Sequence, residues 1–220
     1  MRNLRSWGVK CGLVAVAVCV LASWGCTATE DEPELPDFGE LPRSKEDAVF
    51  GLSWSHTEQQ LLAANVISGK SEPILGKLGR MYSEVKLPRH FNDAEWYGVF
   101  FNDKGQMIRV AVLGEPFKDD PSGEKVRKRY EELKDVISRR IPIAGVFEDK
   151  AAWTGKTNWW ASLKDGRTHW ATGFRGDVME AVLEIKAESD RAGSYSLIVD
   201  HLQRMKEING ISEQDDKSVF

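Results

Sequence analysis

The sequence predicts an α+β domain in which antiparallel β-meanders, about seven strands in all, pack against a central amphipathic helix and a short amino-terminal helix. Two observations predict this class. Residues 120–141 carry apolar side chains at spacings of three and four, as an amphipathic helix requires. Shorter segments on both sides of it alternate apolar and polar residues and are separated by glycine-containing turns, as strands of antiparallel sheets are.

The chain begins with the layout of a secretory signal. The first 25 residues hold three cations and no acid, and residues 11–21 are uninterruptedly apolar. An apolar run of about 15 residues is shorter than the roughly 20 that span a bilayer. The sequence therefore predicts a signal peptide over 1–25 and export. The alternative is an uncleaved amino-terminal anchor, which also places the domain outside the cytoplasm.

The three cysteines, Cys11, Cys19 and Cys26, all lie in or at the edge of this leader, so no disulfide can hold the folded domain together. Residues 21–26, Leu-Ala-Ser-Trp-Gly-Cys, resemble a bacterial lipoprotein signal, in which a small residue precedes a cysteine that is lipidated and becomes the mature amino terminus. The resemblance implies lipidation of Cys26 and a membrane partner through that lipid anchor.

Three neighbouring residues bear on this resemblance. Ser23 stands where lipoprotein signals usually have leucine, and ordinary signal cleavage after Ala28 is the alternative to lipidation. Thr27 after the cysteine favours the outer membrane of a two-membrane host, by resemblance to lipoprotein sorting rules. We therefore expect a protein of the cell envelope, held in the periplasm or at the cell surface.

An acidic, proline-rich linker occupies residues 26–44. After the cysteine it contains three prolines, six acids and almost no apolar side chains, so it cannot bury enough surface to fold. As a flexible coil it would span roughly 25 Å, enough to hold a domain clear of lipid headgroups. We expect a single α+β domain over 45–210 and a flexible polar tail over 211–220.

The charge balance argues against a nucleic-acid partner. Net charge is −4, and removing the first 25 residues leaves −7, of which the linker accounts for −5. The remainder of the chain is nearly balanced at −2, so no basic surface that would attract a polyanion is indicated.

A short helix opens the domain. Thr57 with Gln60 three residues later forms a capping box, and we expect this helix to end at Ser68-Gly69. The Gly-x-x-Trp-x-x-Thr pattern at 51–57 resembles the opening of small exported bacterial domains, the β-lactamase-inhibitor-like and outer-membrane-assembly lipoproteins. The resemblance implies one or two helices before an antiparallel meander, and a protein partner. It carries no binding residue over to this chain.

Three strands are expected before the central helix, over 82–87, 95–101 and 107–113. Residues 102–105 join the last two, with Gly105 free to take a positive φ in the hairpin. In the last strand apolar and polar positions alternate, so one face of this meander is expected to be wet.

The central helix has its own start and stop signals. Asp120 can accept hydrogen bonds from free backbone amides, and Pro121 suits the first helical position. Arg139 and Arg140 complement the negative end of the helix dipole before Pro142 stops the helix.

Four more strands are expected after this helix and then a short helix over 200–208. The expected strands are 157–163, 168–174, 178–186 and 194–199. Asp165-Gly166 and Gly176-Asp177 are predicted to be tight hairpin reversals. The third strand alternates four apolar residues from Met179 to Ile185 with Glu180, Glu184 and Lys186, which predicts a core face and a solvent face.

Four tryptophans gather in this half, Trp153, Trp159, Trp160 and Trp170. On a strand, the adjacent Trp159 and Trp160 would point to opposite faces, which leaves one of them at least partly exposed. Trp159, Trp160 and Trp170 are therefore the candidate binding surface for a protein or glycan partner. The alternative is that a loop or helix covers them.

The groups that could carry chemistry are incomplete. Residues 155–157, Gly-Lys-Thr, end like a phosphate-binding loop, but Lys150 stands where its first glycine would be, so no nucleotide is expected. Ser55 beside His56, and Ser162 near His169, lack the context that activates a nucleophile. The four histidines, His56, His90, His169 and His201, are too widely spaced for a predicted metal site. We expect no catalytic residue, cofactor or metal.

The sequence therefore favours a membrane-tethered extracytoplasmic binding or protein-interaction module, a lipoprotein with an envelope partner. An exported hydrolase with an unrecognised active site is the first alternative, and it requires His56 or His169 to meet a carboxylate and a nucleophile. A structural envelope component is the second, and it predicts that Trp159 and Trp160 are fully covered within one chain.

Overall fold

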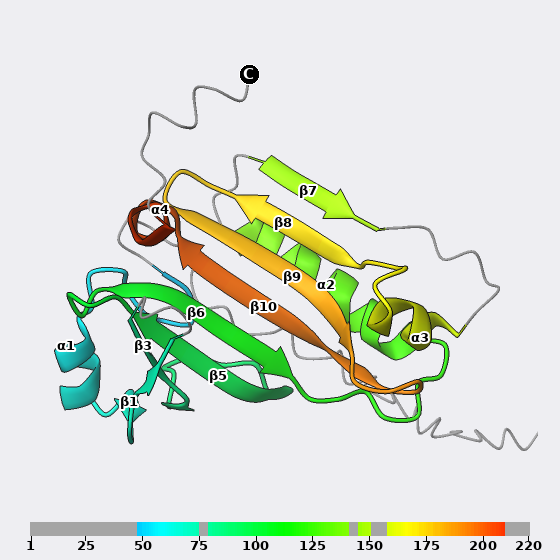
Figure 1. The fold of residues 1–220 in the computed structure, drawn as a ribbon, viewed down its shortest axis with the longest axis horizontal. Coiled ribbons are helices and arrows are strands. Elements are labelled where there is room, and N and C mark those ends of the chain that lie inside the picture. Colours follow the sequence, from blue (N-terminus) through cyan, green and yellow to red (C-terminus); the bar gives the residue numbers. More distant parts are fainter. Residues whose placement is uncertain (1–47, 75–78, 141–144, 151–157, 210–220) are drawn as a thin grey trace, which may run out of the picture. The chain divides into compact units, whose positions relative to one another are not determined.

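The chain has the predicted class: in a computed structural model, helices and an antiparallel sheet form an α+β domain (Figure 1). The structure describes residues 48–74, 79–140, 145–150 and 158–209, all of which belong to the unit Leu35–Phe220. The predicted signal peptide, Cys26, the linker and the tail lie outside these residues. Within the described ranges, no helix is long and apolar enough to cross a membrane.

The described residues contain a main antiparallel sheet of eight strands, where about seven strands were expected in all. In spatial order its strands are β2 (Glu72–Pro73), β3 (Arg80–Tyr82), β5 (Ala94–Phe101), β6 (Met107–Gly114), β10 (Gly193–His201), β9 (Met179–Ala187), β8 (Ala171–Arg175) and β7 (Gly145–Asp149). A separate two-stranded sheet pairs β1 (Ile67–Ser68) with β4 (Glu84–Val85). Because β6 and β10 are neighbours, the two predicted meanders join into one sheet.

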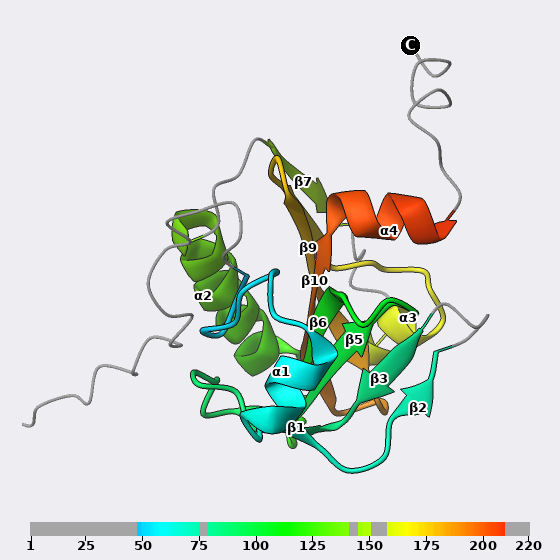
Figure 2. The same cartoon turned by 90° about the vertical axis from the view of Figure 1, so that its left-hand side faces the viewer.

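The helices of the described ranges are α1 (Glu58–Ala63), α2 (Glu124–Arg140), α3 (Trp159–Lys164) and α4 (Leu202–Asn209). The longest of them, α2, lies along one face of the sheet, and α4 lies on the other side (Figure 2). Val126 and Tyr130 of α2 are fully buried. The Tyr130 hydroxyl shares a 2.5 Å hydrogen bond with the Thr172 hydroxyl of β8. Burial raises the pKa of Tyr130 to about 12, so this side chain is neutral at physiological pH.

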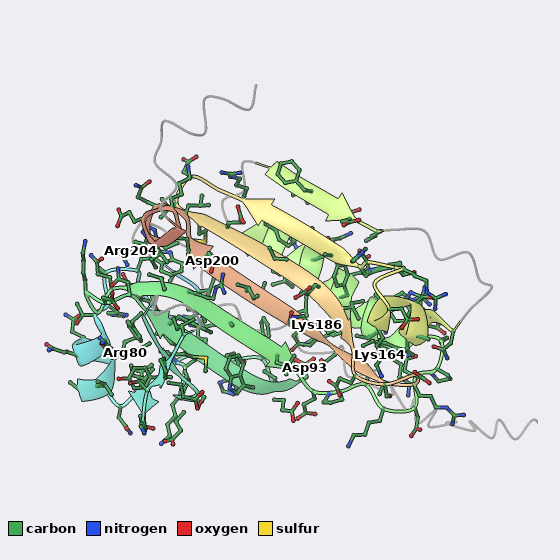
Figure 3. All side chains as sticks on the ribbon, in the orientation of Figure 1. Arg80, Asp93, Lys164, Lys186, Asp200 and Arg204 are labelled. Carbon is green, nitrogen blue, oxygen red and sulfur yellow. The ribbon has the colours of Figure 1, made fainter. Side chains whose placement is uncertain are left out.

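Two carboxylates fix the position of α2. Asp120 caps the helix as expected, because its two oxygens accept from the backbone amides of Glu124 and Val126, at 2.9 and 3.1 Å. Asp93, labelled in Figure 3, lies just before β5 and receives two 2.7 Å hydrogen bonds from the guanidinium of Arg129. The bonds of Asp120 are local, whereas those of Asp93 tie α2 to the segment before β5.

The short first helix begins as predicted and ends early. The capping box is confirmed: the Thr57 amide donates to the Gln60 side chain at 2.8 Å, and the Gln60 amide donates to the Thr57 hydroxyl at 3.3 Å. The predicted end at Ser68-Gly69 is wrong, because α1 stops at Ala63. Asn65, with φ +56°, reverses the chain there, since asparagine tolerates the left-handed conformation.

The strands expected before α2 are confirmed in part. Residues 95–101 and 107–113 form β5 and β6, and Gly105 takes φ +71° in the turn between them. The strand expected over 82–87 is divided, because β3 ends at Tyr82 in the main sheet and β4 belongs to the small one. After α2, the predicted strands over 178–186 and 194–199 and the predicted final helix are confirmed as β9, β10 and α4.

The strand expected over 157–163 is wrong, because Trp159–Lys164 forms the helix α3. The Asn158 side chain caps its start by accepting from the amide of Ala161 at 3.1 Å. Gly166, with φ +68°, ends the helix instead of turning a hairpin, and its amide donates to the carbonyl of Leu163. A glycine in the left-handed conformation occurs both in hairpin turns and at helix ends. Asp165-Gly166 therefore does reverse the chain, but at the end of a helix and not in a hairpin.

Candidate functional site: the open face of the sheet

The two faces of the eight-stranded sheet differ in what they bury. On the face toward α2, one row of side chains crosses five strands and is 0–1% exposed. This row is Val99, Val110, Val199, Ala181 and Phe174. It is the centre of the domain core, and α2 packs against the neighbouring strands β9 and β10.

The face directed away from α2 consists of three rows of residues, and we call these rows together the open face. Its middle row, the apolar row, crosses six strands and contains only glycine and apolar residues. The apolar row is Gly98, Ala111, Ile198, Val182, Gly173 and Phe147. Ile198 and Val182 are half-buried, and Phe147 at the edge is 66% exposed. Gly98 and Ala111 are buried, so the accessible part of the apolar row runs from Ile198 to Phe147.

The rows on both sides of the apolar row mix charged and polar residues with apolar ones. One flanking row is Phe100, Arg109, Asp200, Glu180, Arg175 and Gly145, and the other is Trp96, Leu113, Ser196, Glu184, Ala171 and Asp149. In the first, the guanidinium of Arg109 donates to both oxygens of Asp200, at 2.6 and 2.8 Å, and lies 5.8 Å from the ring of Phe100. The hydrogen bond to Asp200 raises the pKa of Arg109. These charges are neutralised within the chain.

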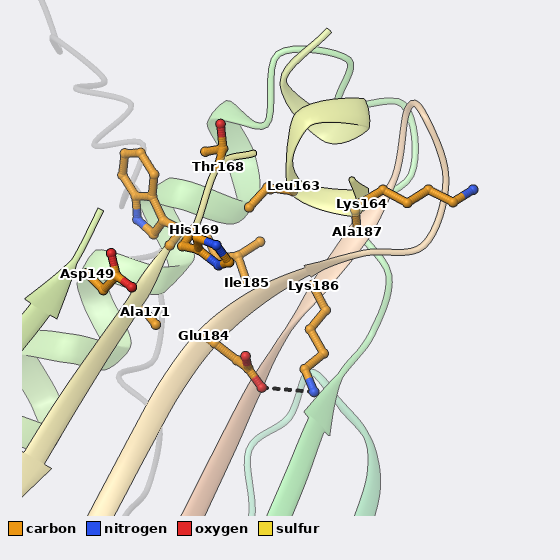
Figure 4. A pocket seen from close by; sticks show the side chains of 11 residues that line it. Asp149, Leu163, Lys164, Thr168, His169, Ala171, Glu184, Ile185, Lys186 and Ala187 are labelled. Atoms are coloured by element: carbon orange, nitrogen blue, oxygen red, sulfur yellow. Dashed lines mark ion pairs between the residues drawn. The ribbon is translucent and has the colours of Figure 1, made fainter. Parts of the chain in front are cut away.

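A pocket of about 320 Å³ opens where α3 meets the open face (Figure 4). Its lining residues come from β7, α3, the segment before β8, and β8 and β9. They are Asp149, Leu163, Lys164, Thr168, His169, Trp170, Ala171, Glu184, Ile185, Lys186 and Ala187. Glu184 accepts one hydrogen bond from the Ser196 hydroxyl, at 3.0 Å, and forms a 2.8 Å ion pair with Lys186. The pocket offers charges of both signs beside apolar walls, so it suits a mixed polar and apolar group such as a partner side chain.

The structure buries two of the three tryptophans predicted as a binding surface. Trp159 and Trp160 are 1% and 0% exposed, and the Trp160 indole donates to the carbonyl of Asp120 at 2.5 Å. The expectation that one of them is exposed rested on a strand, whereas the helix α3 turns both toward the core. The alternative expectation, that they are covered, is the one the structure bears out. Trp153 lies outside the described residues.

Trp170 is half-buried and is the one member of the predicted surface that borders the candidate site. Its ring lies between two cations, with the Arg127 guanidinium 5.8 Å and the Lys150 ammonium 5.1 Å from the ring centre. The contact holds Trp170 between α2 and the chain after β7, so the ring forms a fixed wall of the pocket.

The structure gives no support to either of the serine and histidine pairs that the sequence raised. Nδ1 of His56 accepts from the backbone amide of Ser53, while the Ser55 hydroxyl hydrogen-bonds the Ser53 hydroxyl at 2.7 Å. Ser162 is 2% exposed inside α3, and His169 is exposed at the pocket. Among the described residues, no group of histidine, cysteine and carboxylate side chains could hold a metal ion. The Gly-Lys-Thr segment at 155–157 lies outside the described residues.

The other two histidines lie elsewhere. His90 is exposed in the segment before β5, and the ring of His201 packs edge-on against Trp54 at 5.3 Å. The histidines therefore do not converge on one site with a carboxylate and a nucleophile.

The fold and the site define a class: an α+β domain with one sheet face closed by a helix and one open face that carries an apolar strip between charged rims. Comparison of the chain with protein-family models, with curated proteins and with solved structures found no match.

Proposed function

We propose that this chain is a membrane-tethered extracytoplasmic binding module that holds a protein partner on the open face of its sheet. The observation that carries the proposal is the apolar row between two rows that contain paired charges, namely Arg109 with Asp200, Arg175 with Glu180, and Glu184 with Lys186. An apolar centre with a polar rim is the usual anatomy of a protein interface. Because Arg109 and Asp200 neutralise each other, the rim adds little net charge and the apolar centre supplies the driving force.

The leader and the linker supply the tether in this proposal. A lipid on Cys26 would anchor the chain in the cell envelope, and the acidic linker would allow the domain to stand roughly 25 Å from the headgroups. A glycan partner is less well supported than a protein, because sugar rings stack on exposed aromatic faces and Trp159 and Trp160 are buried.

A structural envelope component is the second candidate. The burial of Trp159 and Trp160 within one chain is the outcome expected for it. Both candidates share the tether, and they differ in whether the open face captures a discrete partner. The exported hydrolase gains no support from the described residues, because the Ser55 hydroxyl bonds the Ser53 hydroxyl and Ser162 is buried whereas His169 is exposed.

The anchor is tested by metabolic labelling with a palmitate analogue in a bacterium that expresses the full chain. We expect the unaltered chain to be labelled and Cys26→Ala to lose the label, because the thiol of Cys26 is the proposed attachment site. Equal labelling of the two proteins would remove the lipid anchor from the proposal.

The open face is tested by placing a photo-crosslinking amino acid at Ile198, in the middle of the apolar row, in the full chain in its envelope fraction. We expect irradiation to produce a discrete crosslinked species. The matched control is the same substitution at Leu62, which is 40% exposed on α1. We expect at least about tenfold less crosslinked product at Leu62, because a partner docked on the open face would contact position 198 and would not contact position 62. Equal, diffuse crosslinking at both positions would favour the structural component.

A further inference from the structure

The two edges of the eight-stranded sheet are built differently. At one edge β2 has two residues, Glu72 and Pro73, and a proline has no N–H group to offer a further strand. At the other edge β7 has five residues and contains neither proline nor lysine. Natural sheets protect an edge by shortening it or by placing proline or charged side chains on it. In the described residues, β2 is both short and proline-bearing, whereas β7 is longer and carries only two acids, Glu148 and Asp149, at its carboxyl end.

The edge strand β7 is also apolar at its centre. Val146 and Phe147 of β7 are 49% and 66% exposed, the two highest values among large hydrophobic side chains of the described residues. Phe147 lies opposite Gly173 at the end of the apolar row, and Val146 lies opposite Phe174 on the α2 side. Both faces of the edge therefore present an apolar side chain beside backbone groups directed away from β8, which is a template for another strand.

Ion pairs hold β7 in place before any association. Lys134 of α2 forms a 2.9 Å pair with Glu148, and Lys150 forms a 2.8 Å pair with Glu131 of α2. These contacts fix the strand against the helix, and a strand that is already ordered loses less conformational entropy when it pairs. They also neutralise Glu148, so this edge charge does not oppose an approaching strand.

We propose that a second copy of this chain pairs with β7 through its own β7, antiparallel and centred on Phe147, so that two eight-stranded sheets become one. In this register Phe147 lies opposite the partner's Phe147, Glu148 opposite the partner's Val146, and Asp149 opposite the partner's Gly145. Every acid then faces an uncharged residue. A parallel pairing would instead set the acids of the two copies side by side, which is unfavourable. The antiparallel arrangement is also the one that a twofold axis generates.

The pairing would bring the two apolar rows together at the two Phe147 rings, so a dimer would present one doubled open face. The proposal does not depend on the proposed function, because the self-pairing of β7 holds whether or not the open face captures a partner. The two are also tested by different substitutions, at Phe147 and at Ile198.

Cysteine crosslinking of the full chain in its native envelope tests the register. Phe147→Cys places two thiols directly opposite each other, within the reach of a disulfide, so we expect a disulfide-linked dimer on a non-reducing gel. Asp149→Cys is the matched control on the same exposed strand. Its thiol would lie about 13 Å along the strand from the partner's equivalent, since the offset is four residues, so we expect at least about tenfold less dimer.

Leu62→Cys reports random collision, because Leu62 is exposed on α1, away from the edge. Dimer formation at position 147 alone supports the antiparallel pairing. Dimer formation at both 147 and 149 would overturn it, because that result indicates parallel pairing or random collision. Dimer formation at neither position would also overturn it, because that result indicates no self-pairing. The three substituted side chains are all exposed, so none of the changes removes core contacts.

Discussion

Replacing Trp160 with alanine is expected to lower the free energy of unfolding by about 3–5 kcal/mol. The side chain is 0% exposed and packs edge-on against Trp159 at 4.7 Å. It also fills the space over Gly193, where an added Cβ would lie only 2.2 Å from the indole ring. Truncation would leave a cavity and would remove the hydrogen bond that the indole donates to the carbonyl of Asp120. Urea unfolding followed by far-UV circular dichroism measures the loss.

The matched control is Trp96→Ala, the same change on the open face. Trp96 is half-buried and its ring lies over Gly98. We expect its loss to cost at most about 1.5 kcal/mol, because the ring gives up less buried apolar area and leaves no enclosed cavity. Equal losses for the two variants would contradict the placement of Trp160 in the core.

The parts of the fold that the sequence predicted correctly are those whose signals are local. The helix α2 and its cap Asp120 were recognisable because both lie within one segment, although the helix begins at Glu124 and not at Pro121 as expected. The β5–β6 hairpin was recognisable because Gly105 lies between two alternating runs. Each of these features is satisfied by neighbours a few residues away, so no knowledge of distant contacts is required.

The helix α3 was mistaken for a strand because six residues are too few to show helical periodicity. Trp159 and Trp160 are aromatic, and aromatic residues are enriched in strands. The decisive contacts are distant: Trp160 bonds Asp120, and Trp159 lies against Gly123 at the start of α2. The available local evidence was the pair Asn158 and Gly166, which fits a helix cap and a helix end as well as it fits turns.

The open face could not be assembled from the sequence because it depends on the register of six strands. Gly98 of β5 and Phe147 of β7 lie in the same row, but four strands separate them and the pairing of each strand must be known to align them. The strand β7 was also not predicted. One local signal was present. Val182 stands among Glu180, Glu184 and Lys186 on the predicted solvent face of β9, but single apolar residues are common on protein surfaces, so this residue alone does not identify the apolar row.

Replacing Glu58 with glutamine is expected to cost about 2 kcal/mol at pH 7, the second largest effect. Glu58 is the first residue of α1, and its side chain is 11% exposed. It accepts from Arg80 Nε at 2.9 Å and from the Tyr82 hydroxyl at 2.8 Å, and Arg80 Nη2 reaches its second oxygen. These bonds fasten α1 to β3. Because the Arg80 side chain is 40% exposed, solvent screening keeps the loss below that of a fully buried pair.

The effect of this substitution should depend on pH. The hydrogen bond from Arg80 holds the pKa of the Glu58 carboxyl below its ordinary value of 4.5, against the burial that raises it. Since the pKa is lower in the folded than in the unfolded chain, the carboxylate stabilises the fold above pH 4.5, and this stabilisation is lost as the pH falls through the lowered pKa. The difference in unfolding free energy between the unaltered protein and Glu58→Gln should therefore be constant near neutrality and shrink in acid.

Urea unfolding at a series of pH values from 7 down to the acid limit of the fold measures this difference. The control is Glu148→Gln, which removes a carboxylate that is 44% exposed and paired with Lys134. We expect it to cost less than about 1 kcal/mol and to be weakened by added salt, as exposed ion pairs are. If Glu58→Gln cost no more than Glu148→Gln, or if its effect persisted unchanged in acid, the link from α1 to β3 would not depend on the charge of Glu58. The capping box of Thr57 and Gln60 would then have to hold the helix alone.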